Sequence, residues 1–352
     1  MDTRKDASQA DRSPELAEAR DSSGGRATIY DVARVAGVAT STVSRALSQP
    51  GRVSFRTAEH VRRVAEQIGY HSAKMERVLP EQSTGLLAVV VADITNPVFH
   101  GMVRGAERTA AHAGYTMVMV ETQESEHSER EALQRVLPAV DGLVLTSSRM
   151  SDTAIRAVAK RTATVVLNRM VGQVASVATD NVKAVKRAAE HLAALGHPAI
   201  AYLSGPEASW ADGMRWRGLR EAGYELDLKV RRIGPSLPTM RGGASAAEEW
   251  LEHRTSAVIA YNDLVALGFI QTVMAAGVRV PEDVSVVGFD NIMDAELVSP
   301  RLTTLAAPLV SLGSAAVNHL LNNGRRDTAH RAEPVLLPAR LVTRDSTGTY
   351  AG

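Results

Sequence analysis

The chain has 352 residues, of which 45% are hydrophobic and 22% are charged, a balance typical of globular proteins of two or three domains. It contains no cysteine, which excludes a disulfide scaffold, a thiol nucleophile, a zinc ribbon and an iron–sulfur site. No apolar run approaches the roughly 20 residues that span a bilayer, and the N-terminus lacks the apolar segment of a signal peptide. We therefore expect a cytoplasmic protein.

The net charge of +1 is unevenly distributed along the chain. Residues 26–80 contain 9 Lys or Arg and 4 Asp or Glu, whereas residues 1–25 contain 4 and 6. A compact basic segment on a slightly acidic chain indicates a nucleic-acid-binding head. A merely solvated basic surface would give the same count, so charge alone leaves both interpretations open.

The first 84 residues are predicted to form a tail, three short helices and a connector. Residues 1–26 have almost no large apolar side chains, so a disordered tail is expected. A capping-box pair, Thr28 and Asp31, begins the first helix, and Gly37 suits its end. Inward-facing positions recur at helical spacing: Ile29, Val32, Ala33, Ala36, Val43, Leu47, Val61, Val64, Ala65 and Ile68. Residues 71–84 are too short a connector to form a stable helix alone.

From residue 85 the pattern changes to alternating strands and helices, which predicts an α/β fold with doubly wound parallel sheets. Two similar halves indicate two lobes, and the second strand of each half follows Ala-Gly-Tyr, at 113–115 and 222–224. The expected strands are 86–93, 115–121, 142–147, 165–168, 199–204, 225–231, 257–262 and 284–290.

Polar side chains stand at the carboxyl ends of these strands, where doubly wound sheets bind ligands. A cleft between the lobes would gather them, although each could simply mark the exit of a strand into a loop. These residues are Asp93, Asn168, Arg169, Asn262, Asp263, Asp290 and Asn291.

A series of short, distinct motifs lies along most of the chain at characteristic spacing. In the basic segment they are Thr28-Ile29-Tyr30-Asp31-Val32-Ala33, Ala36-Gly37-Val38, Thr42-Val43-Ser44-Arg45, Val53-Ser54 and Gly69-Tyr70. Later motifs are Asn96-Pro97-Val98-Phe99, Asp180-Asn181, His191-Leu192, Gly196-His197, Tyr261-Asn262-Asp263, Val287-Gly288-Phe289-Asp290, Leu302-Thr303-Thr304 and Arg344-Asp345-Ser346-Thr347. The chain thereby resembles the LacI/GalR family of transcriptional regulators, over about residues 27–347.

The resemblance implies a helix-turn-helix DNA-binding domain at 27–73, a hinge at 74–84 and an effector-binding, dimerising body at 85–347. The body would have two lobes, like a periplasmic sugar-binding protein, and a short tail, 348–352, would follow. No leucine heptad follows the final motif, so a homodimer on a pseudo-palindromic operator is expected rather than a tetramer.

The second helix of the head has one polar face, and Arg45 on it can reach O6 and N7 of a guanine in the major groove. Considered alone, that face could be an ordinary solvent-exposed helix face that does not contact DNA. The resemblance implies that the Leu79 side chain inserts between base pairs in the minor groove, although Leu79 could instead pack on the body. The expected DNA-binding residues are Thr28, Tyr30, Thr40, Ser41, Ser44, Arg45, Ser48, Ser54, Thr57 and Leu79.

The resemblance also implies that a small-molecule effector binds between the lobes. A sugar is expected, because Arg, Asn and Asp side chains form paired hydrogen bonds with hydroxyl groups. The expected effector-binding residues are Asp93, Phe99, Asp180, Trp210, Arg215, Asn262 and Asp290. The alternative is a corepressor-dependent regulator that responds to a non-sugar metabolite such as a nucleobase.

Enzymatic motifs for phosphate binding, zinc hydrolysis or a serine nucleophile are absent from the sequence. A repressor of transcription is therefore expected, with no catalytic residues, no cofactor and no metal. A secreted sugar-binding protein would share the two lobes, but it would lack the helix-turn-helix segment.

Overall fold

A computed structural model describes residues 27–48, 53, 55–68, 83–323 and 334–351. These residues form two compact units, the helices of the head in one and everything from residue 83 onward in the other. The expected tail 1–26 and most of the expected hinge, with Leu79, lie outside the described residues.

The head consists of α2 (Ile29–Ala36), α3 (Thr40–Ser48) and α4 (Phe55–Gln67). The predicted capping box is present at Thr28 and Asp31, and Gly37 ends α2 with a left-handed φ of 63°. Hydrogen bonds from Thr28 lower the pKa of the Asp31 carboxyl group. A small core holds the three helices together; its buried members are Val32, Ala33, Ala36, Val43, Ala46, Val61, Val64 and Ala65.

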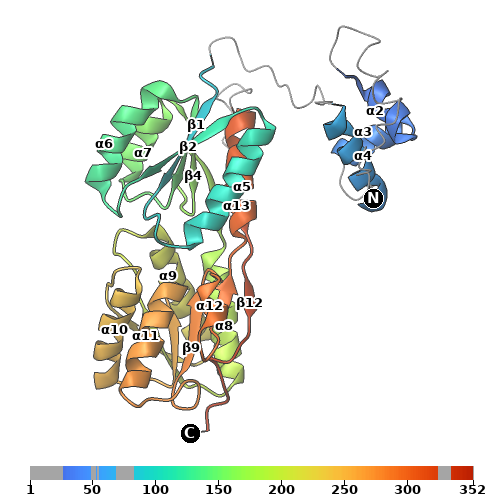
Figure 1. Cartoon of the computed structure of the whole chain (residues 1–352). Coiled ribbons are helices and arrows are strands. Elements are labelled where there is room, and N and C mark those ends of the chain that lie inside the picture. The colour runs from blue at the N-terminus through green and yellow to red at the C-terminus, as the bar shows by residue number, and fades with distance from the viewer. Residues whose placement is uncertain (1–26, 49–52, 54, 69–82, 324–333, 352) are drawn as a thin grey trace, which may run out of the picture. The chain divides into compact units, whose positions relative to one another are not determined.

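The body contains two six-stranded sheets, which confirms the predicted two-lobed α/β fold (Figure 1). In the first lobe the strand order is β11-β5-β4-β3-β1-β2, all parallel. Its elements are β1 (Leu86–Val91), α5 (Val98–His112), β2 (Thr116–Glu121), α6 (Glu126–Val136), η1 (Leu137–Ala139), β3 (Gly142–Thr146), α7 (Asp152–Ala159), β4 (Ala163–Leu167), β5 (Ala175–Thr179), α13 (Leu309–Asn323) and β11 (Val335–Leu337).

In the second lobe the strand order is β12-β10-β9-β8-β6-β7, parallel except that β12 runs antiparallel to β10. Its elements are α8 (Asn181–Ala194), β6 (Ala199–Leu203), α9 (Trp210–Glu225), β7 (Lys229–Ile233), α10 (Met240–Glu252), β8 (Ala257–Ala260), α11 (Asp263–Ala275), β9 (Ser285–Phe289), α12 (Asp294–Leu297), β10 (Thr303–Ala306) and β12 (Arg340–Val342). The chain passes between the lobes three times, after β5, β10 and β11.

Helices cover both faces of each sheet, which explains the strongly apolar strands. Helices α5 and α13 pack on one face of the first sheet, and α6 and α7 contribute to the core on the other. On the second sheet α10 and α11 cover one face, and α8 and α9 cover the other. The carboxyl ends of the strands of both lobes therefore remain available to line a site.

Two expectations about the strands were wrong. The strand expected at 225–231 lies at 229–233, because α9 continues to Glu225 and includes the Ala-Gly-Tyr at 222–224. Gly223 is needed inside that helix, since a Cβ there would lie 2.9 Å from a methyl carbon of Val230. Strands β5, β10, β11 and β12 were missed, because they are only three to five residues long; β5 and β10 are also built largely from Ala, Ser and Thr.

The segment 348–352 was expected to be a tail, but its described part is bonded to the second lobe. The Gly348 carbonyl accepts a hydrogen bond from the His197 ring at 3.1 Å, and the Tyr350 amide donates to the Leu195 carbonyl at 2.8 Å. Desolvation lowers the pKa of His197. Gly348 and Tyr350 therefore belong to the packed second lobe.

Candidate functional site

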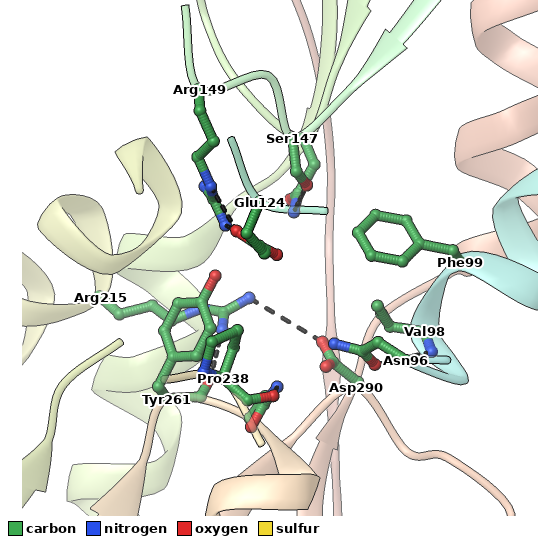
Figure 2. Close-up of a pocket in the computed structure, with 12 residues that line it drawn as sticks. Asn96, Val98, Phe99, Glu124, Ser147, Arg149, Arg215, Pro238, Tyr261 and Asp290 are labelled. Carbon is green, nitrogen blue, oxygen red and sulfur yellow. Dashed lines mark hydrogen bonds and ion pairs between the residues drawn. The ribbon is translucent and has the colours of Figure 1, made fainter. Parts of the chain in front are cut away.

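A pocket lies between the two lobes, at the carboxyl ends of their strands (Figure 2). It is lined by residues that follow β1, β2, β3 and β4 of the first lobe and β7, β8 and β9 of the second, together with Arg215 on α9. Its lining contains two arginines and two carboxylates. The lining residues are Asn96, Val98, Phe99, Glu124, Ser147, Arg149, Asn168, Arg215, Pro238, Tyr261, Asn262 and Asp290.

Arg215 reaches the pocket from α9 and is 3% exposed. Its Nε donates a hydrogen bond to Asn181 Oδ1 at 2.9 Å, and Nη1 donates to the carbonyl of Tyr261. The guanidinium carbon lies 3.5 Å from the centroid of the Phe289 ring, a cation–π contact. Nε and one N–H of Nη1 are therefore bonded within the second lobe, and Nη2 faces Asp290.

Asp290 faces Arg215 from the loop after β9, with 3.9 Å between Oδ1 and Nη2 (Figure 2). Its backbone has φ 115°, a left-handed conformation that side chains rarely adopt. Burial raises the pKa of Asp290 well above its usual range, and Arg215 offsets only part of that shift. A strained, desolvated carboxyl group at a strand end is typical of a functional position.

Buried Asp263 holds the loop after β9, which contains Asp290, through hydrogen bonds. Its Oδ2 accepts a hydrogen bond from the Ile292 amide at 2.9 Å, and its Oδ1 accepts one from the Thr304 hydroxyl at 2.6 Å. Desolvation raises the pKa of Asp263 to about 7. Asp263 was expected to face the cleft with the other strand-end residues, but it does not line the pocket.

Arg149 and Glu124 form the charged wall of the first lobe. Arg149 Nε and Nη2 lie 2.6 and 2.5 Å from Glu124 Oε2. The loop that contains Arg149 is held by Glu129 on α6, whose Oε2 accepts a hydrogen bond from the Arg149 amide at 3.0 Å. Desolvation raises the pKa of Glu129. Ser147, in the same loop, has φ 53° and accepts a hydrogen bond from Asn168 at 3.1 Å.

Four of the seven expected effector-binding residues line the pocket: Phe99, Arg215, Asn262 and Asp290. Asn262 also caps α11, since its Oδ1 accepts from the Val265 amide at 2.9 Å, while its Nδ2 donates to the Pro238 carbonyl at 3.1 Å.

The other three expected residues do not belong to the lining. Asp93 accepts hydrogen bonds from the amide and hydroxyl of Thr95, at 2.8 and 2.6 Å. Asp180 caps α8 by accepting from the Lys183 amide at 3.1 Å. Trp210 is half-buried at the first position of α9.

Sequence reasoning missed Glu124, Ser147 and Arg149. All three follow strands that were predicted, β2 and β3, within four residues of the strand end. Asp93 and Asn262 were selected as polar residues at the carboxyl ends of predicted strands. The same criterion, extended a few residues into each following loop, would have included Glu124, Ser147 and Arg149. Tyr261 was noted as part of a motif but not as a ligand-binding residue.

In the head, α3 presents the polar face that was predicted. Ser41, Ser44 and Arg45 are exposed, and Thr40 is half-buried. Tyr30 on α2 is 73% exposed, Thr28 is exposed, and Thr57 on α4 is half-buried. Ser54 and the side chain of Ser48 lie outside the described residues. The exposed polar face stands opposite buried Val43, as a DNA-reading helix requires.

None of the helices that the structure describes has the length and apolar character of a membrane span. Nor do the described parts of the chain contain a group of three or more His, Cys, Asp or Glu side chains arranged to hold a metal ion.

Comparisons with known proteins agree with both regions. Residues 28–72 match the family of bacterial regulatory proteins, lacI family, and residues 189–347 match the periplasmic binding protein-like domain. The chain is 31% identical over 331 residues to the HTH-type transcriptional repressor CytR of Escherichia coli K12, which covers 91% of this chain and 96% of that protein.

Two solved structures are similar over most of their length. The lac repressor dimer bound to operator and the anti-inducer ONPF has a TM-score of 0.68 and 26% identity, covering 92% of this chain and 100% of its own. A LacI family transcriptional regulator from Enterococcus faecium with bound ribose has a TM-score of 0.66 and 28% identity, covering 75% and 99%.

Proposed function

The chain belongs to the LacI family of bacterial transcriptional regulators, and from this premise we propose that it is a dimeric repressor controlled by a neutral, hydroxyl-rich effector. The effector, a sugar, binds in the pocket between the lobes. The observation that supports this effector most strongly is that two carboxyl groups, Glu124 and Asp290, stand beside the two arginines of the lining.

An anionic effector would lie beside the carboxyl groups of Glu124 and Asp290. Glu124 already pairs with Arg149, whereas Arg215, after donating to Asn181 and to the Tyr261 carbonyl, keeps N–H groups that can donate to a hydroxyl. The other polar lining groups are amides, hydroxyls and carboxyl groups, which suit the alternating donors and acceptors of a polyol. The ribose bound to the Enterococcus faecium regulator has the same chemistry.

For the four expected residues in the pocket, we propose direct roles. Arg215, Asn262 and Asp290 bind effector hydroxyls, and Phe99 packs against the apolar face of the ring. Phe99 would also accommodate a flat nucleobase, so a corepressor of that kind is the second candidate. Asp93, Asp180 and Trp210 do not line the pocket, so we propose no direct effector contact for these three residues.

In the head, we propose that α3 reads the operator and that Arg45 bonds a guanine. Thr40, Ser41, Ser44 and Ser48 would contact base edges or phosphates. Contacts to phosphate would come from Thr28, Tyr30, Ser54 and Thr57, and Leu79 in the hinge at 74–84 would wedge the minor groove. This division assigns DNA binding to 27–73 and effector binding to 85–347. Because the protein binds operator DNA, we expect it to act in the cytoplasm. We also expect it to have no enzymatic activity.

A thermal-shift screen of the full-length dimer tests the effector class. The panel contains D-ribose, cellobiose and other neutral sugars, their phosphate esters, nucleobases and nucleosides. A true effector at about 100 times its Kd should add roughly 2.7 kcal/mol to the apparent stability. Stabilisation by phosphate esters alone would contradict the neutral class.

A gel shift with a pseudo-palindromic duplex then tests repression. The effector should release the duplex, whereas a corepressor would strengthen binding. Arg45→Ala should cost about 1–3 kcal/mol and relax preference at one operator position. If Arg45→Ala lowered the affinity for all DNA sequences equally, Arg45 would contact a phosphate instead of a guanine.

A further inference from the structure

Tyr261 follows β8 directly, and helix α9 holds it at its hydroxyl, its ring and its backbone. The Tyr261 hydroxyl lies 3.0 Å from Oγ of Ser209, the residue that caps α9. The Arg215 guanidinium carbon lies 4.9 Å from the centroid of the Tyr261 ring, and Arg215 Nη1 donates a hydrogen bond to the Tyr261 carbonyl. Packing and hydrogen bonds of this kind lock a side chain in one rotamer.

The backbone of Gly205, in the loop after β6, packs directly against the Tyr261 ring. A Cβ at Gly205 would lie 2.5 to 2.7 Å from three carbons of that ring. Gly205 does not belong to the pocket lining, so this contact is on a side of the ring that does not face the pocket.

The loop that contains Gly205 is itself fixed by buried Asp212 on α9. The Gly205 amide donates a hydrogen bond to Asp212 Oδ1 at 2.7 Å. Asp212 also accepts from the Tyr202 hydroxyl at 2.9 Å and from Arg232 Nη2 at 2.6 Å. The Tyr261 ring therefore cannot move away from the pocket without displacing a hydrogen-bonded loop.

The pocket between the two lobes is small. The Tyr261 ring bounds it on the side of the second lobe, and Phe99, which is 4% exposed, bounds it on the side of the first (Figure 2). The space between the lining atoms is about 330 Å³, with the open solvent at its mouth included. Small-molecule sites usually measure roughly 300–1,000 Å³, so a ligand with one ring suits this pocket better than a ligand with two.

We propose that Tyr261 is a specificity-determining residue, which excludes a second ring from the pocket and so limits the effector to a single-ring molecule. The inference deepens the proposed function and rests on it: for a neutral, hydroxyl-rich effector, the class is a monosaccharide. A disaccharide is rejected because it would have to displace the Tyr261 ring together with its partners. Such a clash with a larger ligand is a common source of specificity.

Calorimetric titration of the full-length dimer tests this size limit with pairs of ligands that differ by one ring. The pairs are D-glucose and cellobiose, D-galactose and lactose, D-ribose and adenosine, and adenine and adenosine. The parent protein should bind the single-ring member of one pair at least roughly 100-fold more tightly than the two-ring member, since even one misfitting methylene costs roughly 10- to 200-fold.

Three variants show whether the Tyr261 ring is the cause. Tyr261→Ala removes the ring, so the ratio of the two affinities in that pair should fall at least about tenfold. Tyr261→Phe keeps the ring and loses only the contact of the hydroxyl with Ser209, so its ratio should stay close to that of the parent. Tyr224→Ala is the matched control: Tyr224, near the end of α9, is 92% exposed, and its loss should change neither affinity.

Gly205→Ala tests the same wall from behind, and it remains informative if Tyr261→Ala fails to fold. Its added methyl group would overlap the Tyr261 ring and push it toward the pocket, so the single-ring affinity should fall about tenfold or more. Equal affinity of the parent for both members of its best pair, or an unchanged ratio in folded Tyr261→Ala, would overturn the proposal. Binding of adenine, with the sugars and adenosine rejected, would count against the proposed sugar class and leave the size limit standing.

Discussion

The two lobes build their halves of the pocket differently. In the second lobe, Arg215 and Asn262 are bonded to several neighbours, so they serve the fold as well as the pocket. In the first lobe, Arg149 and Glu124 bind mainly each other, on loops held from behind by Glu129. The comparison shows that a lobe can supply a rigid wall either by bonding its pocket side chains to several neighbours or by pairing them with each other on supported loops.

The largest expected effect is the loss of stability when Arg215 is truncated. Arg215→Ala leaves Asp290 and Asn181 without their partner and opens a cavity against Phe289, so the free energy of unfolding should fall by about 3–5 kcal/mol. The control is Arg217→Ala, two residues away, whose exposed, solvent-screened pair with Glu221 should contribute little to stability. Denaturant unfolding measures both, and similar losses would show that the second lobe does not depend on its buried arginine.

Each lobe also uses one buried carboxyl group to hold a pocket loop, and these groups should make stability depend on pH. Asp263 keeps its proton up to about pH 7 in the folded protein, against a usual pKa of 3.8. Its contribution to stability is therefore complete below about pH 4 and falls as the pH rises to 7, by roughly 4 kcal/mol. Above pH 7 both states are ionised and the contribution is constant.

The measurement is denaturant unfolding of the parent and of Asp263→Asn between pH 4.5 and 7.5. The difference between them should fall with increasing pH. Burial raises the pKa of Glu129 too, so Glu129→Gln should remove a smaller slope of the same sign. A parent slope that both variants retain would mean that neither carboxyl group is protonated in the folded body.

The sequence could predict the features that depend on local patterns, but not the contacts between residues far apart in the chain. The capping box, the stop at Gly37 and the alternation of strands depend on local patterns, and the structure confirms them. Asn262 and Asp290 stand within the motifs quoted above, and the family resemblance assigns Arg215 to the pocket. Arg149 stands in no such motif, and its partner Glu124, 25 positions away, meets it only when the first sheet is folded.

The smallest change in stability is expected from exchanging two helix caps, Asn262 of α11 and Asp180 of α8. Asn and Asp cap helices about equally well, so Asn262→Asp and Asp180→Asn should each change the free energy of unfolding by less than about 1 kcal/mol. Their effects on the pocket should differ. Asn262→Asp loses the donor to the Pro238 carbonyl and adds a carboxylate to the pocket, so effector affinity should fall about tenfold or more. Asp180→Asn lies outside the lining and should leave affinity unchanged; calorimetric titration that found the same loss in both variants would make Asp180 an effector-binding residue after all.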